Sequence, residues 1–342
     1  MSEEFKYVLI GGGLASASAA AGIREHDAEG SIAIISAEKY YPYHRPPLSK
    51  GYLVEGDWEP SDVYHEDEDW YQEHNVTYRA GVRATGLDLD SRLVSLASDE
   101  TIQYEKLLIA TGAALIKLDV PGSQVEGLFY LRNIPDTEEL IKASENAGKA
   151  VVVGGGFIGL ELASSLRQRG MDVTLVYMED RVWAQMLTPE IAQWLEEYYR
   201  GKGIGLKNGS QVTELHGGDR VESVSLGTGE ALAADMVAIG IGVRPDLSLV
   251  KGTALEGENG IPVNSYLESD AAGVYAAGDI AWYEDPLFNK RRRVEHFETA
   301  KGHGAAAGAN MAGERVPYSE LPYFFSDLFD LEFEFVGDFD LQ

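Results

Sequence analysis

None of the 342 residues is cysteine. A structural disulfide, a thiolate metal site and a redox-active cysteine pair are therefore all excluded. Long apolar runs are also missing, because the stretch from Tyr7 to Ile23 is mostly Gly, Ala and Ser and too weakly hydrophobic to span a membrane. The acidic start at residues 1–4 does not resemble a signal peptide. These absences predict a soluble cytoplasmic protein with no membrane span and no metal site.

Basic residues are scarce. The chain has 28 Lys and Arg against 56 Asp and Glu, which gives a formal net charge of −28. Such a field repels phosphate backbones and argues against nucleic acid as a partner. The hydrophobic fraction of 44% is that of a globular protein. The length predicts about two domains.

The N-terminal region has the pattern of a βαβ unit. Residues 6–10 form a short apolar run, typical of a buried parallel strand, and a glycine-rich turn follows that contains Gly11, Gly13 and Ser16. A small-residue helix and a second strand at residues 32–36 come next, with Glu38 just beyond. Small residues let the backbone approach a pyrophosphate at the helix N-terminus, and a carboxylate at this distance can bind a ribose hydroxyl.

The same pattern occurs a second time. A strand at residues 150–153 leads into Gly154, Gly156 and Gly159, then a helix, a strand at 173–177 and Glu179. One glycine-rich turn is weak evidence, but two copies with strand, helix, strand and acid all in place predict two dinucleotide sites.

Two further strands end in residues suited to a cofactor. The strand at residues 106–109 runs into Ala110, Thr111 and Gly112, and the strand that begins at Gly273 ends at Asp279. Ligands of doubly wound folds collect at the carboxyl ends of strands. Asp279 is therefore a candidate for a cofactor hydroxyl, and a role as a helix N-cap is compatible with that.

The order of these patterns predicts an α/β fold with two Rossmann-like, three-layer ββα dinucleotide-binding domains, one inserted in the other. Alternating, turn-broken stretches at 76–104 and 212–240 are typical of small β-meanders appended to each domain. The first of these domains is predicted to be discontinuous, with the second inserted into it. The expected bounds are 1–117 with 245–312 for the first and 118–244 for the second.

Several motifs together resemble a known family. The resemblance begins at residues 42–50, Pro-Tyr-His-Arg-Pro-Pro-Leu-Ser-Lys, and covers the chain in order through segments 107–112, 129–132, 154–161, 242–245, 278–279 and 291–296. It is to FAD-dependent pyridine nucleotide oxidoreductases without a redox disulfide, which include ferredoxin and rubredoxin reductases, apoptosis-inducing factor and monodehydroascorbate reductase. The resemblance implies an FAD-dependent NAD(P)H oxidoreductase that passes hydride from NADH to flavin N5 and electrons on to an acceptor. It also implies that the discontinuous domain is the FAD-binding domain and that the inserted one is the NAD(P)H-binding domain.

The resemblance also implies roles for single residues. Arg45 matches an arginine that touches FAD. Lys50 and Glu161 match an ion pair beside the flavin ring, where the nicotinamide docks, with Lys50 in the first domain and Glu161 in the inserted one. Phe157 matches an aromatic residue against the flavin face, although a phenylalanine after a glycine turn is also typical of a core. Lys50, Glu161 and Phe157 are the candidate catalytic residues.

The candidate cofactor-binding residues share two properties: they lie in the two glycine turns or strand ends, or in the segments that resemble the family. They are Gly11, Gly13, Ser16, Glu38, Arg45, Lys50, Ala110, Thr111, Gly112, Arg132, Gly154, Gly156, Phe157, Ile158, Gly159, Glu161, Glu179, Gly242, Asp279, Glu295, His296 and Phe325.

The donor and the acceptor are less sharply defined. Glu179 favours the free ribose hydroxyls of NADH, but Arg181 lies two residues on and keeps NADPH open. The acceptor is a small redox protein of the ferredoxin or rubredoxin type, a quinone or another small molecule. Two alternatives remain: a slow-turnover redox sensor resembling apoptosis-inducing factor, and a monodehydroascorbate reductase-like enzyme. Against the latter, Lys301 and Phe325 stand where those enzymes carry an arginine and a tyrosine.

The C-terminal end departs from the family. Relatives usually continue beyond residues 336–338 into a strand-rich third domain, whereas this sequence stops at Gln342. Residues 313–342 are therefore expected to be the remnant or start of a truncated or missing C-terminal α+β domain. A homodimer is a further expectation, in which a second subunit covers Phe324, Phe325 and Phe329.

Overall fold

The computed structural model describes residues 3–338, and the chain divides into two compact units. The first unit contains the residues up to His44, Pro60–Ala114 and Arg244–Phe324. The second unit contains Arg45–Glu59, Leu115–Val243 and the residues from Phe325 on. Three of the five changes of unit along the chain fall within strands, which are β7 (Ala113–Leu115), β16 (Val243–Pro245) and β21 (Tyr323–Leu328).

The first unit is built on one large sheet. Its elements are β1 (Glu3–Ile10), α1 (Leu14–His26), β2 (Ile32–Ile35), η2 (Pro60–Val63), α3 (Glu68–Glu73), β3 (Val76–Arg79), β4 (Ala84–Asp88), β5 (Leu93–Leu96), β6 (Thr101–Ile109), β17 (Ile261–Val263), β18 (Val274–Ala276), η3 (Gly278–Ile280), β19 (Ala281–Asp285), β20 (Lys290–Arg292) and α7 (Phe297–Met311). The strand order is β3-β2-β1-β6-β5-β4, with β18 also paired to β6. The pairs among β3, β2, β1, β6 and β18 are parallel, whereas β4 and β5 extend the sheet in antiparallel pairs.

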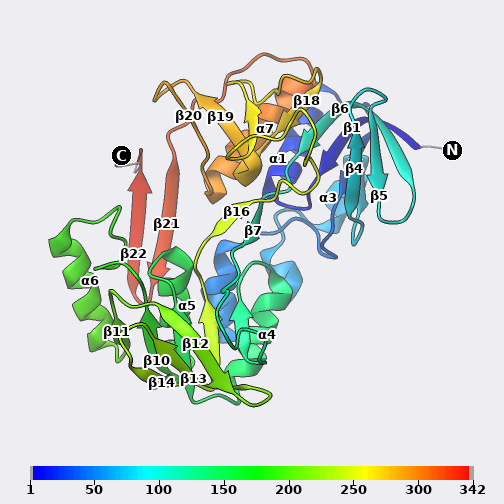
Figure 1. The fold of residues 1–342 in the computed structure, drawn as a ribbon. Coiled ribbons are helices and arrows are strands. Elements are labelled where there is room, and N and C mark those ends of the chain that lie inside the picture. The colour runs from blue at the N-terminus through cyan, green and yellow to red at the C-terminus, as the bar shows by residue number, and fades with distance from the viewer. Residues whose placement is uncertain (1–2, 339–342) are drawn as a thin grey trace. The chain divides into compact units, whose positions relative to one another are not determined.

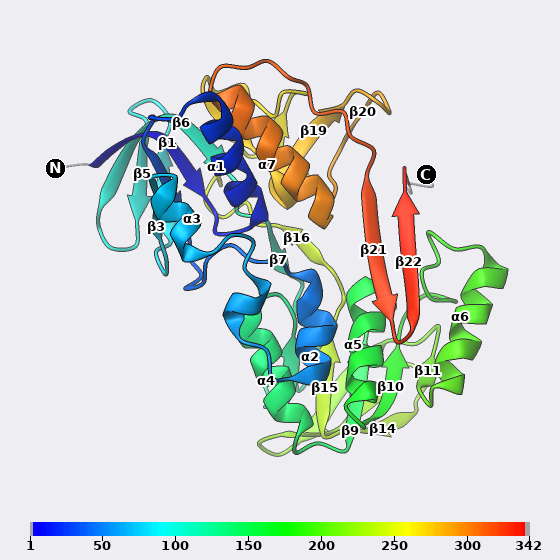
Figure 2. The ribbon, with the colours of Figure 1, turned by 180° about the vertical axis from the view of Figure 1, so that it is seen from behind.

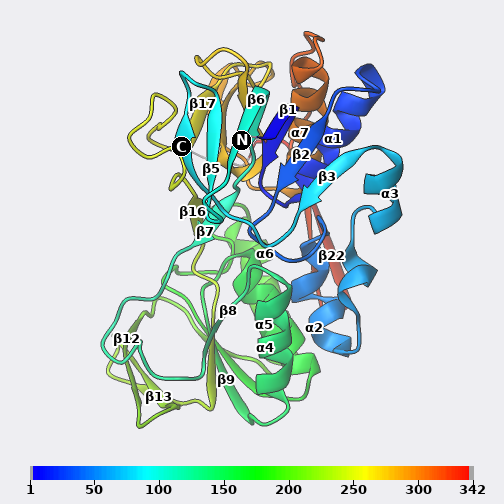
Figure 3. The same cartoon turned by 90° about the vertical axis from the view of Figure 1, so that its right-hand side faces the viewer.

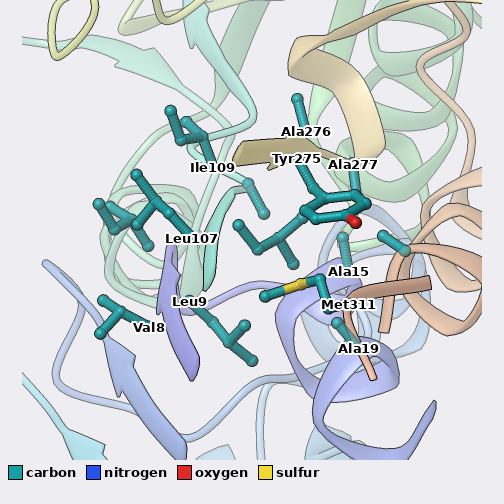
Figure 4. Packing of buried hydrophobic residues seen from close by; sticks show 14 of the residues in the cluster. Val8, Leu9, Ala15, Ala19, Leu107, Ile109, Tyr275, Ala276, Ala277 and Met311 are labelled. Atoms are coloured by element: carbon teal, nitrogen blue, oxygen red, sulfur yellow. The ribbon is translucent and has the colours of Figure 1, made fainter. Parts of the chain in front are cut away.

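Buried apolar runs make this sheet the core of the first unit. All four residues of β2 are buried, as are the last four of β1. Figure 4 shows Leu9 of β1 on the side of Ala15, Ala19 and Met311 of the helices, and Val8, its neighbour in the strand, on the other side. Strands buried on both faces are typical of parallel sheets covered by helices.

Helices α1 and α7 lie side by side in the first unit (Figure 1). Glycines allow this close approach, because a Cβ on Gly304 would lie 2.3 Å from the Ala15 carbonyl oxygen and one on Gly308 2.2 Å from that of Ala19. The small residues of α1 and α7 therefore allow the two helices to pack closely. This packing fixes the position of α1, which follows the glycine turn.

The second unit has a five-stranded parallel sheet of order β11-β10-β9-β15-β8. Its elements are η1 (Pro46–Ser49), α2 (Gly51–Glu55), β8 (Leu128–Tyr130), α4 (Ile134–Ser144), β9 (Lys149–Val153), α5 (Phe157–Gln168), β10 (Asp172–Val176), α6 (Pro189–Gly201), β11 (Gly205–Lys207), β12 (Val212–Gly217), β13 (Val221–Leu226), β14 (Ala231–Ala233), β15 (Met236–Ile239) and β22 (Leu331–Val336). Figure 3 shows α4 and α5 on one side of β8 and β9, and the β12–β13 meander on the other. Val151 and Val153 of the sheet pack with Leu215 and Val224 of the meander in one core. This is the predicted three-layer ββα arrangement.

Two segments fall elsewhere than the sequence indicated. Residues 45–59, expected in the first domain, cluster with the second unit, because Arg169 donates to the carbonyl oxygens of Leu53 (2.9 Å) and Val54 (3.2 Å). Of the expected C-terminal segment 313–342, the part up to Phe324 clusters with the first unit and the rest with the second. Strands β21 and β22 form a two-stranded sheet there (Figure 2). Its last four residues, 339–342, lie outside the described residues, as do residues 1–2.

No helix within residues 3–338 is both long and apolar enough to cross a membrane.

Candidate functional site

The first glycine turn joins β1 to α1 in the first unit. Gly11 has φ +124°, and a Cβ there would lie 2.1 Å from the Ala110 carbonyl oxygen, so only glycine fits. Gly13 is the N-cap of α1, has no side-chain cap, and a Cβ on it would meet nothing within 4 Å. The first turn of α1 carries no acidic residue. Its free N–H groups therefore face an open space suited to a pyrophosphate.

The second glycine turn repeats this geometry between β9 and α5 in the second unit. Gly154 has φ +118°, and its Cβ would lie 2.2 Å from the Gly240 carbonyl oxygen. Gly156 is the N-cap of α5, and no side chain caps this end of the helix. A Cβ on Gly156 would meet no atom within 4 Å. In both turns the first glycine is required because the backbone passes close to a carbonyl oxygen of the neighbouring strand end. The second glycine leaves open space at the N-terminus of the helix. The two turns fit two dinucleotides.

The third position of the motif differs between the turns. In the second turn a Cβ on Gly159 would lie 1.8 Å from the Gly154 carbonyl oxygen, which makes glycine obligatory. In the first turn Ser16 occupies this position, fully buried, and its hydroxyl has no hydrogen-bond partner among the described residues. A buried hydroxyl without a partner, one turn into α1, is compatible with a bound group that supplies the missing bond.

The two predicted ribose carboxylates are held differently. Glu38 is half-buried, and its Oε2 accepts a 2.5 Å hydrogen bond from the hydroxyl of the buried Tyr43. Glu179 is exposed at the end of β10, and its carbonyl oxygen accepts from the Gly209 N–H at 2.8 Å. Arg181 binds both carboxylate oxygens of Asp180 at 2.9 and 3.0 Å and the Ala184 carbonyl at 3.0 Å.

Strand ends complete the first unit's side of the candidate site. Because β6 and β18 are parallel neighbours, Ala110, Thr111, Gly112 and Asp279 follow adjacent strands at the same edge of the sheet. The Thr111 hydroxyl donates to the Asp246 carbonyl oxygen at 3.1 Å, and Gly112 has φ +69°. Asp279 is half-buried in η3, and its carbonyl oxygen accepts from Arg293 at 3.2 Å.

Lys50 and Glu161 form an ion pair inside the second unit. Lys50 Nζ lies 2.8 Å from Glu161 Oε1, with side-chain exposures of 15% and 4%. The Ser326 hydroxyl donates to Oε1 at 2.6 Å, and the Ser49 hydroxyl donates to Oε2. The predicted pair is therefore present, and both of its residues belong to the second compact unit, because residues 45–59 pack on α5.

A cavity of about 100 Å³ adjoins this pair. Its lining includes Arg45, Ser49, Arg132, Ile158, Gly240 and Gly242. An Arg45 Nη1–H donates to the Arg132 carbonyl oxygen, which ties the two arginine-bearing segments together. The structure thus brings four predicted residues, Arg45, Arg132, Ile158 and Gly242, into one cavity, beside the strand end that the second glycine turn packs against.

Aromatic candidates in the second unit lie in two places. Phe157 begins α5 and packs in an aromatic cluster, 5.0 Å from the Trp183 ring and 5.8 Å from the Phe335 ring. Phe325 is half-buried with its ring centroid 5.7 Å from Lys50 Nζ. Phe325 therefore neighbours the ion pair. Contact of Phe157 with a flavin stays a prediction.

Glu295 and His296 belong to the first unit, just before α7. Glu295 is exposed and pairs with Arg293. The His296 ring stacks on Phe324 with centroids 4.0 Å apart, and burial lowers its pKa to about 4. A neutral imidazole, stacked on an aromatic ring of β21, therefore stands at the N-cap of the helix that carries Lys301.

Two residues of the site were not predicted from the sequence. Ser49 and Ser326 are both buried and both donate to Glu161. Ser49 directly precedes Lys50 in the segment 42–50 that resembles the family, so its position in that segment was a signal that could have identified it. Nothing in the sequence near Ser326 points to a residue 165 positions away. Within residues 3–338, no group of three His, Cys, Asp or Glu side chains could hold a metal ion.

Comparisons with known proteins agree with this geometry. Residues 5–304 match the family model described as pyridine nucleotide-disulphide oxidoreductase. Monodehydroascorbate reductase 4, peroxisomal, of Arabidopsis thaliana is 38% identical over 358 residues, which cover 99% of this chain and 73% of that protein. Monodehydroascorbate reductase 4, cytosolic, of Oryza sativa is 37% identical over 359 residues, covering 98% and 82%.

A solved structure is equally similar. The ferredoxin reductase for the CYP199A2 system from Rhodopseudomonas palustris has a TM-score of 0.93 and 35% identity, covering 97% of this chain and 82% of that one. The disulphide in the family description has no counterpart here, because the chain has no cysteine.

Proposed function

Because this chain belongs to the pyridine nucleotide-disulphide oxidoreductase family, we propose that it oxidises NADH through bound FAD and delivers the electrons to a small-molecule acceptor. The chain is an FAD-dependent NAD(P)H oxidoreductase that transfers electrons to an acceptor. The choice of NADH and the class of acceptor are the proposal.

One observation supports the assignment more than any other: the same two-glycine cradle occurs at two helix N-termini, once in each unit. An oxidoreductase with one dinucleotide needs one cradle. Two cradles of identical backbone plan accommodate a bound dinucleotide cofactor and a second dinucleotide that is consumed.

Residues of the first unit would hold FAD. Gly11 and Gly13 leave room for the pyrophosphate, Ser16 offers its buried hydroxyl, Glu38 would accept from ribose, and Asp279 lies at the neighbouring strand end. Arg45 stays a candidate cation for FAD. When bound, FAD supplies a ring that takes a hydride from the nicotinamide and releases single electrons or electron pairs to an acceptor.

Residues of the second unit would hold the nicotinamide cofactor and set the charge at the reacting end. Gly154, Gly156 and Gly159 form its cradle, and Glu179 lies at the ribose end. The buried ammonium group of Lys50, held by Glu161, provides a fixed positive charge in a region of low exposure. No side chain is required to abstract a proton during hydride transfer, so positioning and electrostatics are the protein's contribution.

The state of Arg181 favours NADH. Selection of NADPH needs a guanidinium that is available to a ribose phosphate. The Arg181 guanidinium is engaged by the Asp180 carboxylate and the Ala184 carbonyl, whereas the exposed Glu179 can accept from a ribose hydroxyl and would repel a phosphate.

The basic run at residues 291–293 bears on the acceptor. A small acidic ferredoxin would need a basic docking face. Arg291 pairs with Glu284 at 2.7 Å, Arg292 with Asp285 at 3.5 Å, and Arg293 with Glu295. Each arginine thus has its own carboxylate, and the run offers little net positive charge on a protein of net charge −28. This supports a small-molecule acceptor such as a quinone.

The monodehydroascorbate radical is a second candidate acceptor, favoured by the names of the similar proteins. Two positions argue against it. Lys301 pairs with Glu298 at 3.3 Å and lies 5.5 Å from the Phe297 ring, and Phe325 has no hydroxyl. Neither residue reproduces the planar guanidinium and the phenol expected for ascorbate chemistry.

An acceptor panel tests the proposal. FAD-loaded protein is supplied with NADH or NADPH and, separately, with a quinone, ferricyanide, the monodehydroascorbate radical, a ferredoxin, a rubredoxin or dioxygen. We expect NADH to be oxidised fastest with the quinone, and more slowly with the ferredoxin. Fast turnover with only the ferredoxin or only the radical would overturn the proposed acceptor. Negligible turnover with every acceptor, after normal flavin reduction, would instead identify a redox sensor.

Location and assembly complete the proposal. The composition favours the cytoplasm, and the two relatives differ, one being named cytosolic and the other peroxisomal. Cell fractionation decides this point. A homodimer stays a prediction, for which sedimentation of the FAD-loaded protein is the test.

A further inference from the structure

One face of α5 carries a stripe of buried polar side chains. Glu161, Ser164 and Ser165 are spaced three and four residues apart, so they share a face of the helix, and none is more than 3% exposed. Buried polar groups persist where each has a partner. The partners of this stripe therefore show what the face is for.

The stripe binds two segments that are distant in the sequence. On one side the Ser165 hydroxyl donates to the Ser49 carbonyl oxygen at 2.6 Å, and the Ser49 hydroxyl donates to Glu161. On the other side β21 runs beside α5 (Figure 2), where the Ser326 hydroxyl donates to Glu161 at 2.6 Å and the Phe329 N–H donates to Ser164 at 2.9 Å.

Glu161 is the point at which the two sides meet. Its Oε1 accepts from both Lys50 Nζ (2.8 Å) and Ser326 (2.6 Å), so the serine and the ammonium group share one oxygen. Ser326 is completely buried, and no water-exposed group can replace it. Its hydroxyl draws part of the negative charge of Oε1 and fixes the direction in which the carboxylate faces Lys50.

We propose that Ser326 is a positioning residue for electron entry: from the C-terminal hairpin it orients Glu161 and so sets the place and the effective charge of Lys50. This rests on the proposed function, because the Lys50 ammonium group matters only where a flavin is reduced beside it. Through Ser326 the hairpin β21–β22 is thereby part of the redox site, and an event that separates Ser326 from Glu161 changes the ease of flavin reduction.

The direction of the effect follows from electrostatics. Without the serine hydroxyl, Oε1 carries more uncompensated negative charge and pulls Lys50 toward itself. The region where the flavin gains electrons then becomes less positive, so the flavin midpoint potential shifts to a more negative value. Loss of one hydrogen bond to a charged group predicts flavin reduction slower by about threefold to tenfold at saturating NADH.

The test uses FAD-loaded protein in four forms: the unchanged chain, Ser326→Ala, Ser326→Thr and Ser164→Ala. The midpoint potential of the bound flavin is measured by equilibrium titration against a redox dye. Stopped-flow reduction by NADH then separates the limiting rate from the apparent dissociation constant. Ser164→Ala is the matched control, because it removes a serine that anchors the same hairpin from the same helix without touching Glu161. Ser326→Cys keeps nearly the same volume and serves if the alanine variant does not fold.

We expect Ser326→Ala to lower the potential and the limiting rate with an unchanged dissociation constant. Ser326→Thr should restore both, and Ser164→Ala should leave both unchanged even if urea unfolds it sooner. A Ser326→Ala potential equal to that of the unchanged chain would overturn the proposal, and so would an equal shift in Ser164→Ala. Failure of the unchanged chain to be reduced by NADH would instead overturn the proposed function.

Discussion

The glycine turns of the first and second units share a backbone plan and differ in the side chains around it. In both turns the first glycine has a positive φ and lies against the backbone of a neighbouring strand end. The second glycine is the N-cap of a helix and borders open space. The first turn adds a partnerless buried Ser16 hydroxyl and Glu38 held by Tyr43. The second adds an obligatory Gly159 and an exposed Glu179.

This difference matches two ways of using a dinucleotide. A carboxylate fixed by a buried tyrosine is preorganised, which suits a cofactor that stays bound through many turnovers. An exposed carboxylate offers a contact that forms and breaks readily, which suits a substrate that must leave after each hydride transfer. The same fold thus serves a resident and an exchanging ligand through the side chains beside the turn.

The largest expected effect falls in the second unit, at Lys50. Lys50→Met keeps the aliphatic stem but strands the buried Glu161 carboxylate. We expect a loss of about 3–5 kcal/mol in the free energy of unfolding, together with a markedly slower flavin reduction by NADH. Urea unfolding and stopped-flow absorbance measure the two effects. Lys202→Met is the matched control, because its pair with Asp330 is exposed and screened by solvent, so its loss should change the free energy of unfolding far less. Equal losses in both variants would contradict the buried-pair argument.

Exchanging the two capping glycines separates the two cradles. Gly13→Ala and Gly156→Ala both place a Cβ in open space at backbone angles that alanine adopts, so both variants should fold. Gly13→Ala should weaken FAD retention by about a hundredfold, and Gly156→Ala should retain FAD but raise the KM for NADH about as much, since a methyl group blocks close backbone approach. FAD content after dialysis and the KM are the readouts. The comparison fails if Gly156→Ala releases FAD.

A third difference concerns pH. The first unit buries His303 completely between Tyr283 and Tyr318, and burial lowers the pKa of His303 to about 3. The folded pKa lies below the unfolded value of about 6.5, so the unfolded state takes up the proton first, and stability falls as pH drops below about 6.5. Between pH 7 and pH 5 this residue should cost about 2 kcal/mol.

His303→Leu removes the proton-binding group together with two ring nitrogens that have no hydrogen-bond partner within residues 3–338. We expect the variant to lose less stability than the unchanged chain when urea unfolding is repeated at the lower pH. Equal losses of stability in the two proteins between pH 7 and pH 5 would show that protonation of His303 does not destabilise the first unit.

The smallest effect concerns the choice of nicotinamide cofactor. Glu179→Gln should reduce the preference for NADH over NADPH, measured as the ratio of kcat/KM values, by about tenfold, because a charged acceptor for ribose hydroxyls is lost. Glu197→Gln, an exposed change on α6, is the control. An unchanged ratio would remove Glu179 from the ribose end of the second cradle.

Local patterns predicted the parts of this molecule that depend on neighbours in sequence. The strand, turn and helix around Gly11 and Gly154 follow from hydrophobic runs and small residues within about 30 positions. The family resemblance then placed Lys50 with Glu161, 111 residues apart, and the short distance confirms the pair.

Contacts across long sequence separations were the ones missed. Residues 45–59, predicted in the first domain, cluster with the second compact unit, because Arg169 and Ser165 of α5 hold them and no local pattern shows this. Ser326 could not be linked to Glu161 from the sequence, because nothing in the sequence of a strand indicates which helix it will contact. The carboxylate partners of Arg291 and Arg292 could not be predicted, because they become neighbours only when β19 and β20 pair.

Anaerobic reduction of the FAD-loaded protein by one equivalent of NADH tests the central claim most directly. The account predicts a yellow protein whose visible flavin absorbance bleaches rapidly with NADH and more slowly with NADPH. A protein that stays colourless after incubation with FAD, or a yellow one that neither nicotinamide reduces, would contradict it.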